Sequence, residues 1–464
     1  NKDSGALFLQ RSLYISGDFM KILFISLGCD KNLTNSEEML ALLTENGHEI
    51  VDSEEDAEII VINTCCFIHD AKEESIENIL EMAEYKKSGT CKALIVTGCM
   101  AQRYKEEIIQ EIPEVDAVLG TSSYRDILKA VEEACSGRHF EEYRDINELP
   151  EDTGRPVLTT GGHYGYLKIA EGCDKHCTYC IIPSLRGSFR SVPEERLLAQ
   201  AEYMAEQGVK ELILVAQETT VYGTDLYGKK TLHILLKKLC RIKGIRWIRV
   251  LYCYPEEIYD DLIQVMKEEK KICHYLDLPI QHASDKILKR MGRRTTRAQL
   301  TEIIEKLRRE IPDIVLRTTL ITGFPGETEA DHQELMDFVD QMEFDRLGAF
   351  TYSPEEGTPA EKMTDQVPEE LKEERRDEIM ELQQEISLEK GNDRIGQELM
   401  VMIEGKVSGE SAYIARTYGD APKVDGYLFV QTGELLMTGD FAKVKVTGAL
   451  EYDLIGELAD EYTE

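Results

Sequence analysis

Short runs of β-branched residues alternate with longer amphipathic stretches from Met20 onward. This alternation is typical of parallel strands joined by crossover helices. Asn35, with Glu38 three places on, is a potential N-cap for the first helix. The pattern predicts a doubly wound parallel sheet over residues 20–137. Its expected strands are 21–26, 59–63 and 93–97, and its expected helices are 35–47, 71–85 and 102–111.

The same alternation resumes after a link rich in Gly and Pro and fills a second region, 155–390. Its expected strands are 166–170, 211–216, 247–251, 275–278, 314–321 and 346–351. Its expected helices are 193–206, 232–239, 255–270, 297–309 and 329–341, followed by a connector helix at 368–390. Six β/α units are too few for an eight-stranded barrel, so we predict a partial (β/α)6 barrel. Its working face should lie at the carboxyl ends of the strands.

The pattern changes again beyond Gly391, where short alternating segments are interrupted by glycines. Expected strands include 399–404, 426–430 and 441–446. Segments of this kind predict a small β-barrel, which makes residues 391–460 a third domain.

Charge and apolar content exclude two broad classes of function. In 464 residues, 88 Asp and Glu outnumber 54 Lys and Arg, and the net charge is −34. Because phosphate binding relies on Lys and Arg, a general nucleic-acid coat is excluded, whereas a local basic groove is not. We find no apolar run near the ~18 residues of a membrane span, so we expect no membrane-embedded function.

Twelve cysteines in a chain of this length are too sparse for a disulfide scaffold. Residues 1–19 lack the apolar core and cleavage site of a secretory signal, and we treat them as an extension outside the fold. We therefore expect a reducing, cytoplasmic compartment, in which the cysteines serve metal or redox chemistry.

The strongest local motif is a triplet, Cys173, Cys177 and Cys180, directly after an expected strand. Three thiolates on one loop can hold three irons of a 4Fe–4S cluster and leave the fourth iron open to another ligand. Zinc is the main alternative, but a closed zinc site needs a fourth ligand, and His176 is awkwardly placed between two of the cysteines. Ordinary packing does not require three thiols in eight residues, so the cluster is the favoured interpretation.

A second set of cysteines emerges only when the fold is considered. Cys29, Cys65 and Cys99 follow the three expected strands at intervals close to the ~30 residues of one β/α unit. The carboxyl ends of parallel strands share one edge of a sheet, so these thiols should meet and can hold another open cluster. Each can equally be a small buried hydrophobic residue. Cys66 should face the opposite way, and the core interpretation is preferred for the remaining five: Cys91, Cys135, Cys240, Cys253 and Cys273.

Four segments carry a family resemblance: SLGCDKN at 26–32, INTC at 62–65, VTGCMAQRY at 96–104, and 171–187 around the cysteine triplet. They resemble the methylthiotransferases of the radical S-adenosylmethionine superfamily, over Met20 to about Glu457. The resemblance implies an N-terminal methylthiotransferase domain, a radical S-adenosylmethionine domain in the partial barrel and a C-terminal TRAM barrel. One departure is Cys66, where the family usually has glycine or another small residue.

The resemblance also implies cofactors and site residues. One 4Fe–4S cluster would lie on Cys29, Cys65 and Cys99, and a second on Cys173, Cys177 and Cys180. The second cluster and S-adenosylmethionine would generate a radical that removes hydrogen from the substrate, and the first would carry the sulfur. Cofactor contacts would come from Tyr179, Gln217, Glu218 and the turn from Gly323 to Glu327. No catalytic residue is expected beyond the cluster ligands, and His282 is either near the cofactor or a satisfied histidine at the end of the barrel.

Family members of this kind act on adenosine in transfer RNA or on an aspartate of small-subunit ribosomal protein twelve. Residues 391–464 hold six basic and fourteen acidic residues, so this module should repel phosphate and attract a basic protein. The stretch 415–426 also resembles the ribosomal-protein type. We therefore favour the ribosomal protein as the substrate, with transfer RNA unlikely, and expect a flavodoxin or ferredoxin as electron donor. A transfer-RNA methylthiotransferase and a non-enzymatic zinc or iron–sulfur protein are the alternatives.

Overall fold

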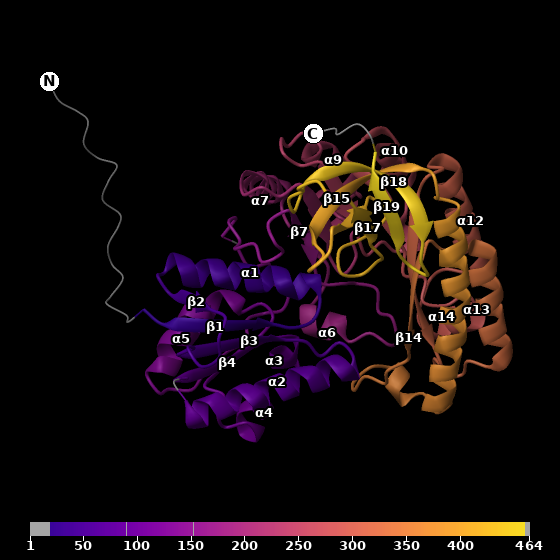
Figure 1. The fold of residues 1–464 in the computed structure, drawn as a ribbon. Coiled ribbons are helices and arrows are strands. Elements are labelled where there is room, and N and C mark those ends of the chain that lie inside the picture. The colour runs from indigo at the N-terminus through magenta and orange to yellow at the C-terminus, as the bar shows by residue number, and fades with distance from the viewer. Residues whose placement is uncertain (1–18, 90, 152, 460–464) are drawn as a thin grey trace. The chain divides into compact units, whose positions relative to one another are not determined.

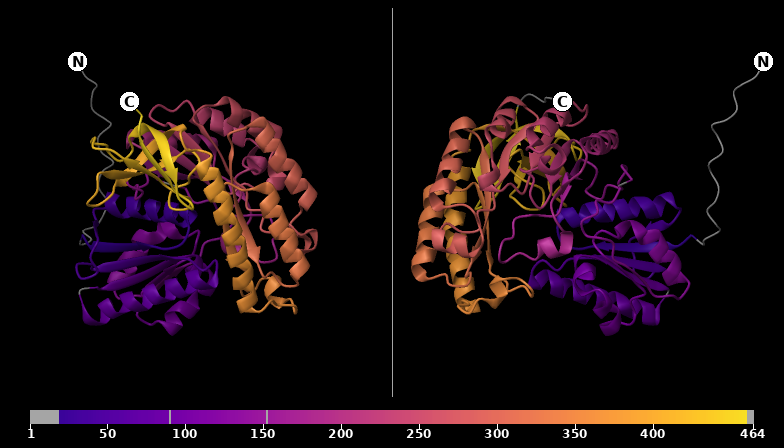
Figure 2. Two further views of the ribbon diagram at one scale, coloured as in Figure 1. Left: turned by 45° about the vertical axis from the view of Figure 1, so that its right-hand side comes forward. Right: turned by 180° about the vertical axis from the view of Figure 1, so that it is seen from behind.

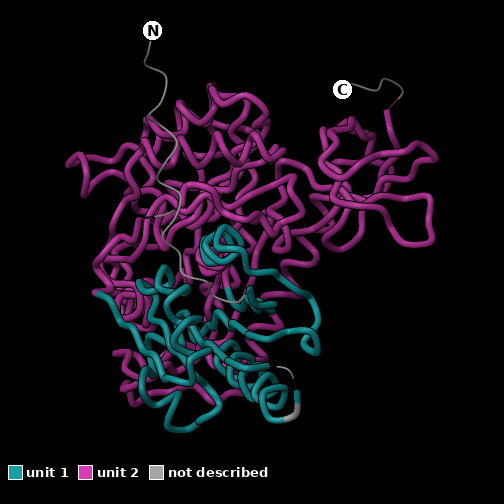
Figure 3. Tube along the Cα trace, turned by 90° about the vertical axis from the view of Figure 1, so that its left-hand side faces the viewer, with its two compact units in different colours: residues 1–28, 38–66, 70–144 teal, residues 29–37, 67–69, 145–464 magenta. Residues whose placement is uncertain are grey.

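The computed structural model describes residues 19–89, 91–151 and 153–459 of the chain. Of the predicted extension, residues 1–18 lie outside this part, as does residue 460 at the end of the predicted third domain. The chain divides into two compact units (Figure 3). Unit 1 contains residues 1–28, 38–66 and 70–144, and unit 2 contains 29–37, 67–69 and 145–464. No helix in the described ranges is long and apolar enough to cross a membrane.

Unit 1 is built on a six-stranded sheet in the order β2-β1-β3-β4-β5-β6 (Figure 1). Every neighbouring pair is parallel, which confirms the predicted doubly wound class. The strands are β1 (Lys21–Ser26), β2 (Glu49–Val51), β3 (Ile59–Thr64), β4 (Ala93–Gly98), β5 (Ala117–Leu119) and β6 (Phe140–Glu142). The three that sequence patterning missed, β2, β5 and β6, have only three residues each, too few to show a period.

The helices of this region depart from two expectations. They are α1 (Asp30–Glu45), α2 (His69–Ser88), α3 (Cys99–Tyr104), α4 (Glu106–Glu111) and α5 (Ile127–Cys135), with the 3₁₀ turn η1 (Tyr124–Asp126). The predicted cap at Asn35 is wrong, because α1 begins at Asp30, and the carbonyl of Cys29 already accepts from the N–H of Leu33. The predicted helix 102–111 is interrupted at Lys105, whose φ of 44° ends α3.

Unit 2 contains the predicted partial barrel, a parallel sheet in the order β14-β13-β12-β11-β10-β7 (Figure 2). Its six strands are β7 (Tyr164–Lys168), β10 (Glu211–Val215), β11 (Trp247–Val250), β12 (Ile272–Asp277), β13 (Val315–Thr322) and β14 (Arg346–Thr351). Each overlaps a predicted strand, and all neighbours pair in parallel, so the (β/α)6 prediction is confirmed. A two-stranded antiparallel pair, β8 (Ala170–Glu171) and β9 (Arg190–Ser191), follows β7.

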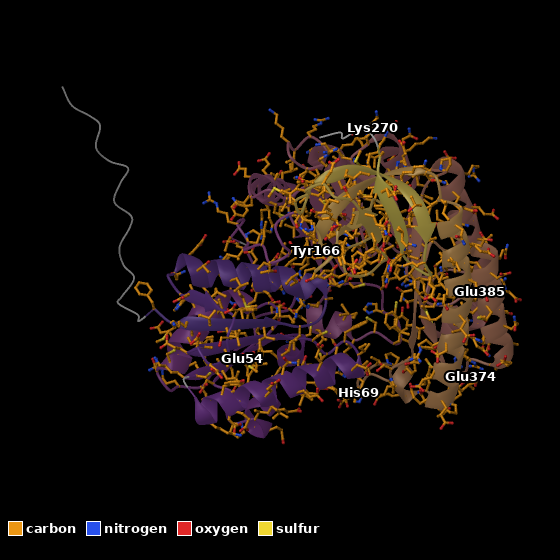
Figure 4. All side chains as sticks on the ribbon, in the orientation of Figure 1. Glu54, His69, Tyr166, Lys270, Glu374 and Glu385 are labelled. Atoms are coloured by element: carbon orange, nitrogen blue, oxygen red, sulfur yellow. The ribbon has the colours of Figure 1, made fainter. Side chains whose placement is uncertain are left out.

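Helices cover the outer face of this sheet and form the largest apolar core of the molecule. The helix α14 (Glu369–Asn392) lies beside α13 (Glu329–Met342) and β14 (Figure 2). Its outward face is acidic, as the exposed Glu374 and Glu385 illustrate (Figure 4). The helices are α6 (Ile182–Arg186), α7 (Glu194–Glu206), α8 (Thr224–Tyr227), α9 (Leu232–Leu239), α10 (Asp260–Glu268), α11 (Asp285–Arg290), α12 (Arg297–Glu310), α13 (Glu329–Met342) and α14 (Glu369–Asn392), with the 3₁₀ turns η2 (Pro255–Glu257) and η3 (Ala360–Lys362).

The C-terminal strands form a closed barrel in the order β15-β16-β17-β19-β18, as predicted. They are β15 (Glu398–Lys406), β16 (Ala412–Thr417), β17 (Leu428–Gln431), β18 (Phe441–Ala449) and β19 (Leu454–Leu458). This barrel packs on the inner face of the six-stranded sheet of unit 2. There, Met402 and Phe441 of the barrel join Ile213 and Trp247 of the sheet in one buried cluster. The inner face of the partial barrel is therefore filled by the small barrel instead of being open along its whole length.

Candidate active site

The cysteine loop, 173–180, lies between β8 and α6 and is held at both ends by backbone hydrogen bonds. The N–H of Cys173 donates to the carbonyl of Gly187 at 3.1 Å. The N–H of Thr178 donates to the carbonyl of Met291 at 2.9 Å, and the Thr178 hydroxyl donates to the carbonyl of Arg290 at 2.8 Å. The loop is therefore fixed at one end to the residue that follows α6 and at the other to the end of α11.

Two thiols of this loop, those of Cys173 and Cys180, lie in surroundings that disfavour free thiolates. Cys173 and Cys177 are buried, and Cys180 is half-buried. Burial raises the pKa of Cys173 to about 11 and the pKa of Cys180 to about 12, and the neighbouring cysteines of the loop raise both further. Thiolates are the form that binds iron, so a bound cation has to offset this penalty. Among the described residues, no group of three or more Cys, His, Asp or Glu side chains is placed closely enough to hold a single metal ion. A 4Fe–4S cluster takes one thiolate at each of three irons and suits soft thiol donors on one loop.

Two predicted cofactor residues, Gln217 and Glu218, follow β10 and carry buried polar atoms without partners. The amide nitrogen of Gln217 donates to Glu171 Oε1 at 2.7 Å, while its Oε1 has no hydrogen bond within the described part of the chain. Glu218 is 1 % exposed, and its Oε2 is likewise unpaired there. Burial raises the pKa of Glu218 to about 7. Acceptors left unpaired in the interior fit a ligand that brings hydrogen-bond donors, such as an amino acid ammonium or a ribose.

The turn after β13 is largely occupied by contacts of its own. Glu327, fully buried at its carboxylate, pairs with Arg375 of α14 at 3.0 Å and accepts from the N–H of Phe324 at 3.2 Å. Gly323 leaves the room that the Lys372 side chain fills, and a Cβ there would collide with it. The turn therefore anchors α14, and Phe324 links it to the cysteine loop through an edge-to-face contact with Tyr179, whose ring centre lies 6.4 Å away.

His282 is fully buried, and its own chain satisfies one of its two ring nitrogens. Its Nδ1 accepts from the N–H groups of Ala283 at 3.0 Å and Ser284 at 2.9 Å. Its Nε2 therefore carries the proton and lies 3.5 Å from Glu327 Oε2. That nitrogen has no hydrogen-bond partner within the described ranges, so the contacts of Nδ1 alone support the structural interpretation of this histidine.

Two cysteines of the second set, Cys65 and Cys99, lie at strand ends of unit 1. Strand register aligns Ser26 with Asn63 and Thr64 with Gly98. Cys65 and Cys99, each 7 % exposed, directly follow β3 and β4. Gly28, the residue before Cys29, packs against the Cys65 thiol, because a Cβ built on Gly28 would lie 2.9 Å from the Cys65 sulfur.

Cys66 turns into the core of unit 1 and is fully buried, as its adjacent position predicts. Burial raises the pKa of Cys66 to about 12, and the neighbouring Cys99 raises it to a smaller extent. Its carbonyl accepts from Arg103 at 3.2 Å. The departure from the family pattern at this position is therefore accommodated as a packed thiol.

The segment that carries Cys29, residues 29–37, belongs to unit 2 and is held there by polar contacts that sequence patterning did not identify. Tyr252 donates from its hydroxyl to Asp30 at 3.1 Å, and Lys31 lies 3.2 Å from the centre of the Tyr252 ring. Asn32 accepts from Arg186 at 3.1 Å. The only signal in the sequence was a run of charged and polar residues directly after the first strand.

Three family models match the chain. Residues 21–120 match "Uncharacterized protein family UPF0004", residues 167–339 match "Radical SAM superfamily", and residues 395–459 match "TRAM domain". The chain is 63 % identical, over 94 % of its length and 99 % of the relative's, to the ribosomal protein uS12 methylthiotransferase RimO of Lachnoclostridium phytofermentans. It is 51 % identical, over 95 % and 99 %, to the protein of that name from Acetivibrio thermocellus.

Solved structures with this fold include the radical S-adenosylmethionine methyltransferase TsrM from Kitasatospora setae, with cobalamin and a [4Fe-4S] cluster bound. The match has a TM-score of 0.53 and 13 % identity, and covers 74 % of each chain. At that identity the likeness concerns the fold alone.

Proposed function

The chain belongs to the ribosomal protein uS12 methylthiotransferase (RimO) family, and from that membership we propose that it adds a methylthio group to the β-carbon of an aspartate in uS12. The observation that carries the proposal is identity of 63 % over nearly the whole of both chains. The three predicted ranges, 20–137, 155–390 and 391–460, would then supply sulfur, radical chemistry and substrate docking in turn.

We assign the cofactor sites residue by residue. Cys173, Cys177 and Cys180 would hold one 4Fe–4S cluster, and the second would lie on the strand-end thiols Cys29, Cys65 and Cys99. When bound, the clusters and S-adenosylmethionine supply the radical and the sulfur. The assignment of the loop cluster is supported by three thiols on one loop, of which those of Cys173 and Cys180 need a nearby cation to form thiolates.

The chain's own groups would bind and orient the cofactor. The unpaired Oε1 of Gln217 and the carboxyl of Glu218 can accept from the ammonium or hydroxyl groups of S-adenosylmethionine. Tyr179 offers an aromatic face at the cysteine loop. Gly323 and Glu327 would support the cofactor site indirectly, because their contacts hold the turn against α14.

Charge supports a protein substrate over transfer RNA. Arg416, one of six basic residues beyond Gly391, is buried and paired with Glu211 and Glu404, so it offers no phosphate contact. Another, Lys443, pairs with Glu398 at 2.9 Å. The acidic excess of the module then favours a basic ribosomal protein and leaves transfer RNA an unlikely substrate. A flavodoxin or ferredoxin would donate the electron, and the cytoplasm, where ribosomes assemble, would be the compartment.

A strain lacking the gene tests the function directly. Mass spectrometry of uS12 and of bulk transfer RNA should show loss of the methylthio mass increment from the protein alone. Complementation with the wild-type gene should restore the increment, and complementation with Cys177→Ala should not. Loss from transfer RNA with an unchanged uS12 would assign the chain to the nucleic-acid branch instead.

A further inference from the structure

Tyr254, in the segment that follows β11, contacts the cysteine loop. Its hydroxyl lies 3.6 Å from the sulfur of Cys177, within hydrogen-bond range for sulfur. This contact is the one hydrogen bond of that hydroxyl recorded among the described residues. The hydroxyl therefore has a thiol, and not a backbone carbonyl, as its partner.

Two cations flank the ring of Tyr254. The guanidinium of Arg293 lies 4.2 Å from the ring centre, and the ammonium of Lys175 lies 5.0 Å from it. The Arg293 side chain is 1 % exposed and donates from Nη2 to the carbonyl of Pro279 at 2.9 Å. Its Nε and Nη1 are buried without a hydrogen-bond partner in the described part of the chain.

Within the described part of the chain, the charge of the Arg293 guanidinium is offset by one carboxylate, which lies at the edge of ion-pair range. Glu256 lies 3.8 Å from Arg293, and Lys175 is already paired with Glu257. Leaving charged donors unsatisfied in the interior is unfavourable unless a negative group faces them. An iron–sulfur cluster with three thiolate ligands is such a group, and it becomes more negative when it accepts an electron.

We propose that Tyr254 and Arg293 are positioning residues that raise the reduction potential of the cluster on Cys173, Cys177 and Cys180. The inference rests on the proposed function, because it requires that cluster. A hydrogen bond to a thiolate sulfur and a nearby cation both stabilise the electron-rich, reduced state more than the oxidised state. Together they make one-electron reduction easier for a weak cellular donor.

The test is a reductive titration of the full chain, followed by electron paramagnetic resonance of the reduced cluster. Replacing Cys29, Cys65 and Cys99 by alanine in every sample leaves one cluster to observe. In that background, Tyr254→Phe keeps the ring and removes only the hydroxyl. We expect about a tenfold fall in the equilibrium constant for reduction, or about 59 mV toward more negative potential.

Tyr259→Phe is the matched control, since that hydroxyl contacts His233 at 3.1 Å instead of a cysteine. Its potential should equal that of the parent. Arg293→Gln should also lower the potential, and Arg293→Lys, which keeps the charge, should restore part of the loss. Iron content per chain measures whether each variant retains the cluster, and a loss of iron in Tyr254→Phe would overturn a role confined to potential.

The potentials decide between a tuning role and simple packing. Equal potentials in Tyr254→Phe and Tyr259→Phe would overturn the proposal while leaving the methylthiotransferase function intact. Absence of any reducible cluster in the parent would overturn both.

Discussion

Replacing Glu211 by glutamine removes the central charge that ties the terminal barrel to the six-stranded sheet. Glu211, at the start of β10, accepts from Arg249 Nε at 2.8 Å and from Arg416 Nη2 at 2.7 Å. All three side chains are fully buried. Burial alone would raise the pKa of Glu211, but Arg416 and Arg249 outweigh it and hold the pKa below its ordinary value. The carboxylate is therefore ionised, and its loss leaves Arg249 without its buried ion-pair partner and Arg416 paired with Glu404 alone.

Breaking a buried ion pair by removing one partner costs about 3–5 kcal/mol, because the remaining charge stays desolvated. We expect Glu211→Gln to lower the free energy of unfolding by that amount. Glu398→Gln is the matched control, since Glu398 pairs with Lys443 at 2.9 Å on the barrel surface and both side chains are about half exposed. An exposed pair contributes about 0–1 kcal/mol.

The chain's single tryptophan reports on this contact. Trp247 is 8 % exposed and lies edge-to-face against Phe441 of the barrel, with ring centres 4.8 Å apart. Its fluorescence in a urea titration should show an earlier transition for Glu211→Gln than for Glu398→Gln. If the two variants unfold at the same urea concentration, the buried ion network does not hold the barrel in place.

Three other outcomes follow from the contacts. Cys177→Ala should abolish reductive cleavage of S-adenosylmethionine, whereas Cys65→Ala should spare cleavage, measured as 5′-deoxyadenosine, yet stop methylthio transfer. Burial raises the pKa of Glu218 from 4.5 to about 7, so between these values the folded state favours the neutral carboxyl and the unfolded state the charged one. The free energy of unfolding should therefore fall by about 3 kcal/mol as the pH rises from 4.5 to about 7. Glu218→Gln should abolish this fall in urea titrations at pH 5 and pH 8. Arg375→Met removes the ion-pair partner of the buried Glu327 carboxylate and should lower the free energy of unfolding by about 3–5 kcal/mol, measured by thermal unfolding. In the control Arg376→Met, which removes a more exposed ion pair, the loss should be about 1 kcal/mol or less.

The fold was predictable where strands are long enough to carry a pattern. All six strands of the central sheet overlap predicted ranges, because buried parallel strands are continuous apolar runs, as in Glu211–Val215. Three-residue strands such as Glu49–Val51 carry no such signal. The early start of α1 at Asp30 was missed because the residues that fix its first turn make their contacts with distant parts of unit 2.

Cysteine positions were predictable because spacing in the chain maps onto loops and strand ends. The supporting residues were not. Tyr254 and Cys177 are 77 residues apart in the chain, and nothing in the spacing of either links them. The small barrel's place on the inner face of the sheet likewise depends on side chains such as Arg416 and Glu211, which are 205 residues apart.

One buried carboxylate connects Gln217, directly beyond β10, to the segment that carries Cys29. Glu171 accepts from Gln217 at 2.7 Å through Oε1 and pairs with Arg186 at 3.4 Å through Oε2, and Arg186 donates in turn to Asn32 at 3.1 Å. Burial would raise the pKa of Glu171, but Lys168 and Arg186 outweigh it and hold the pKa at about 2. The carboxylate is therefore charged at any physiological pH. Because one fixed charge orients both Gln217 and the first turn of α1, Gln217 and the Cys29 turn are positioned together within unit 2.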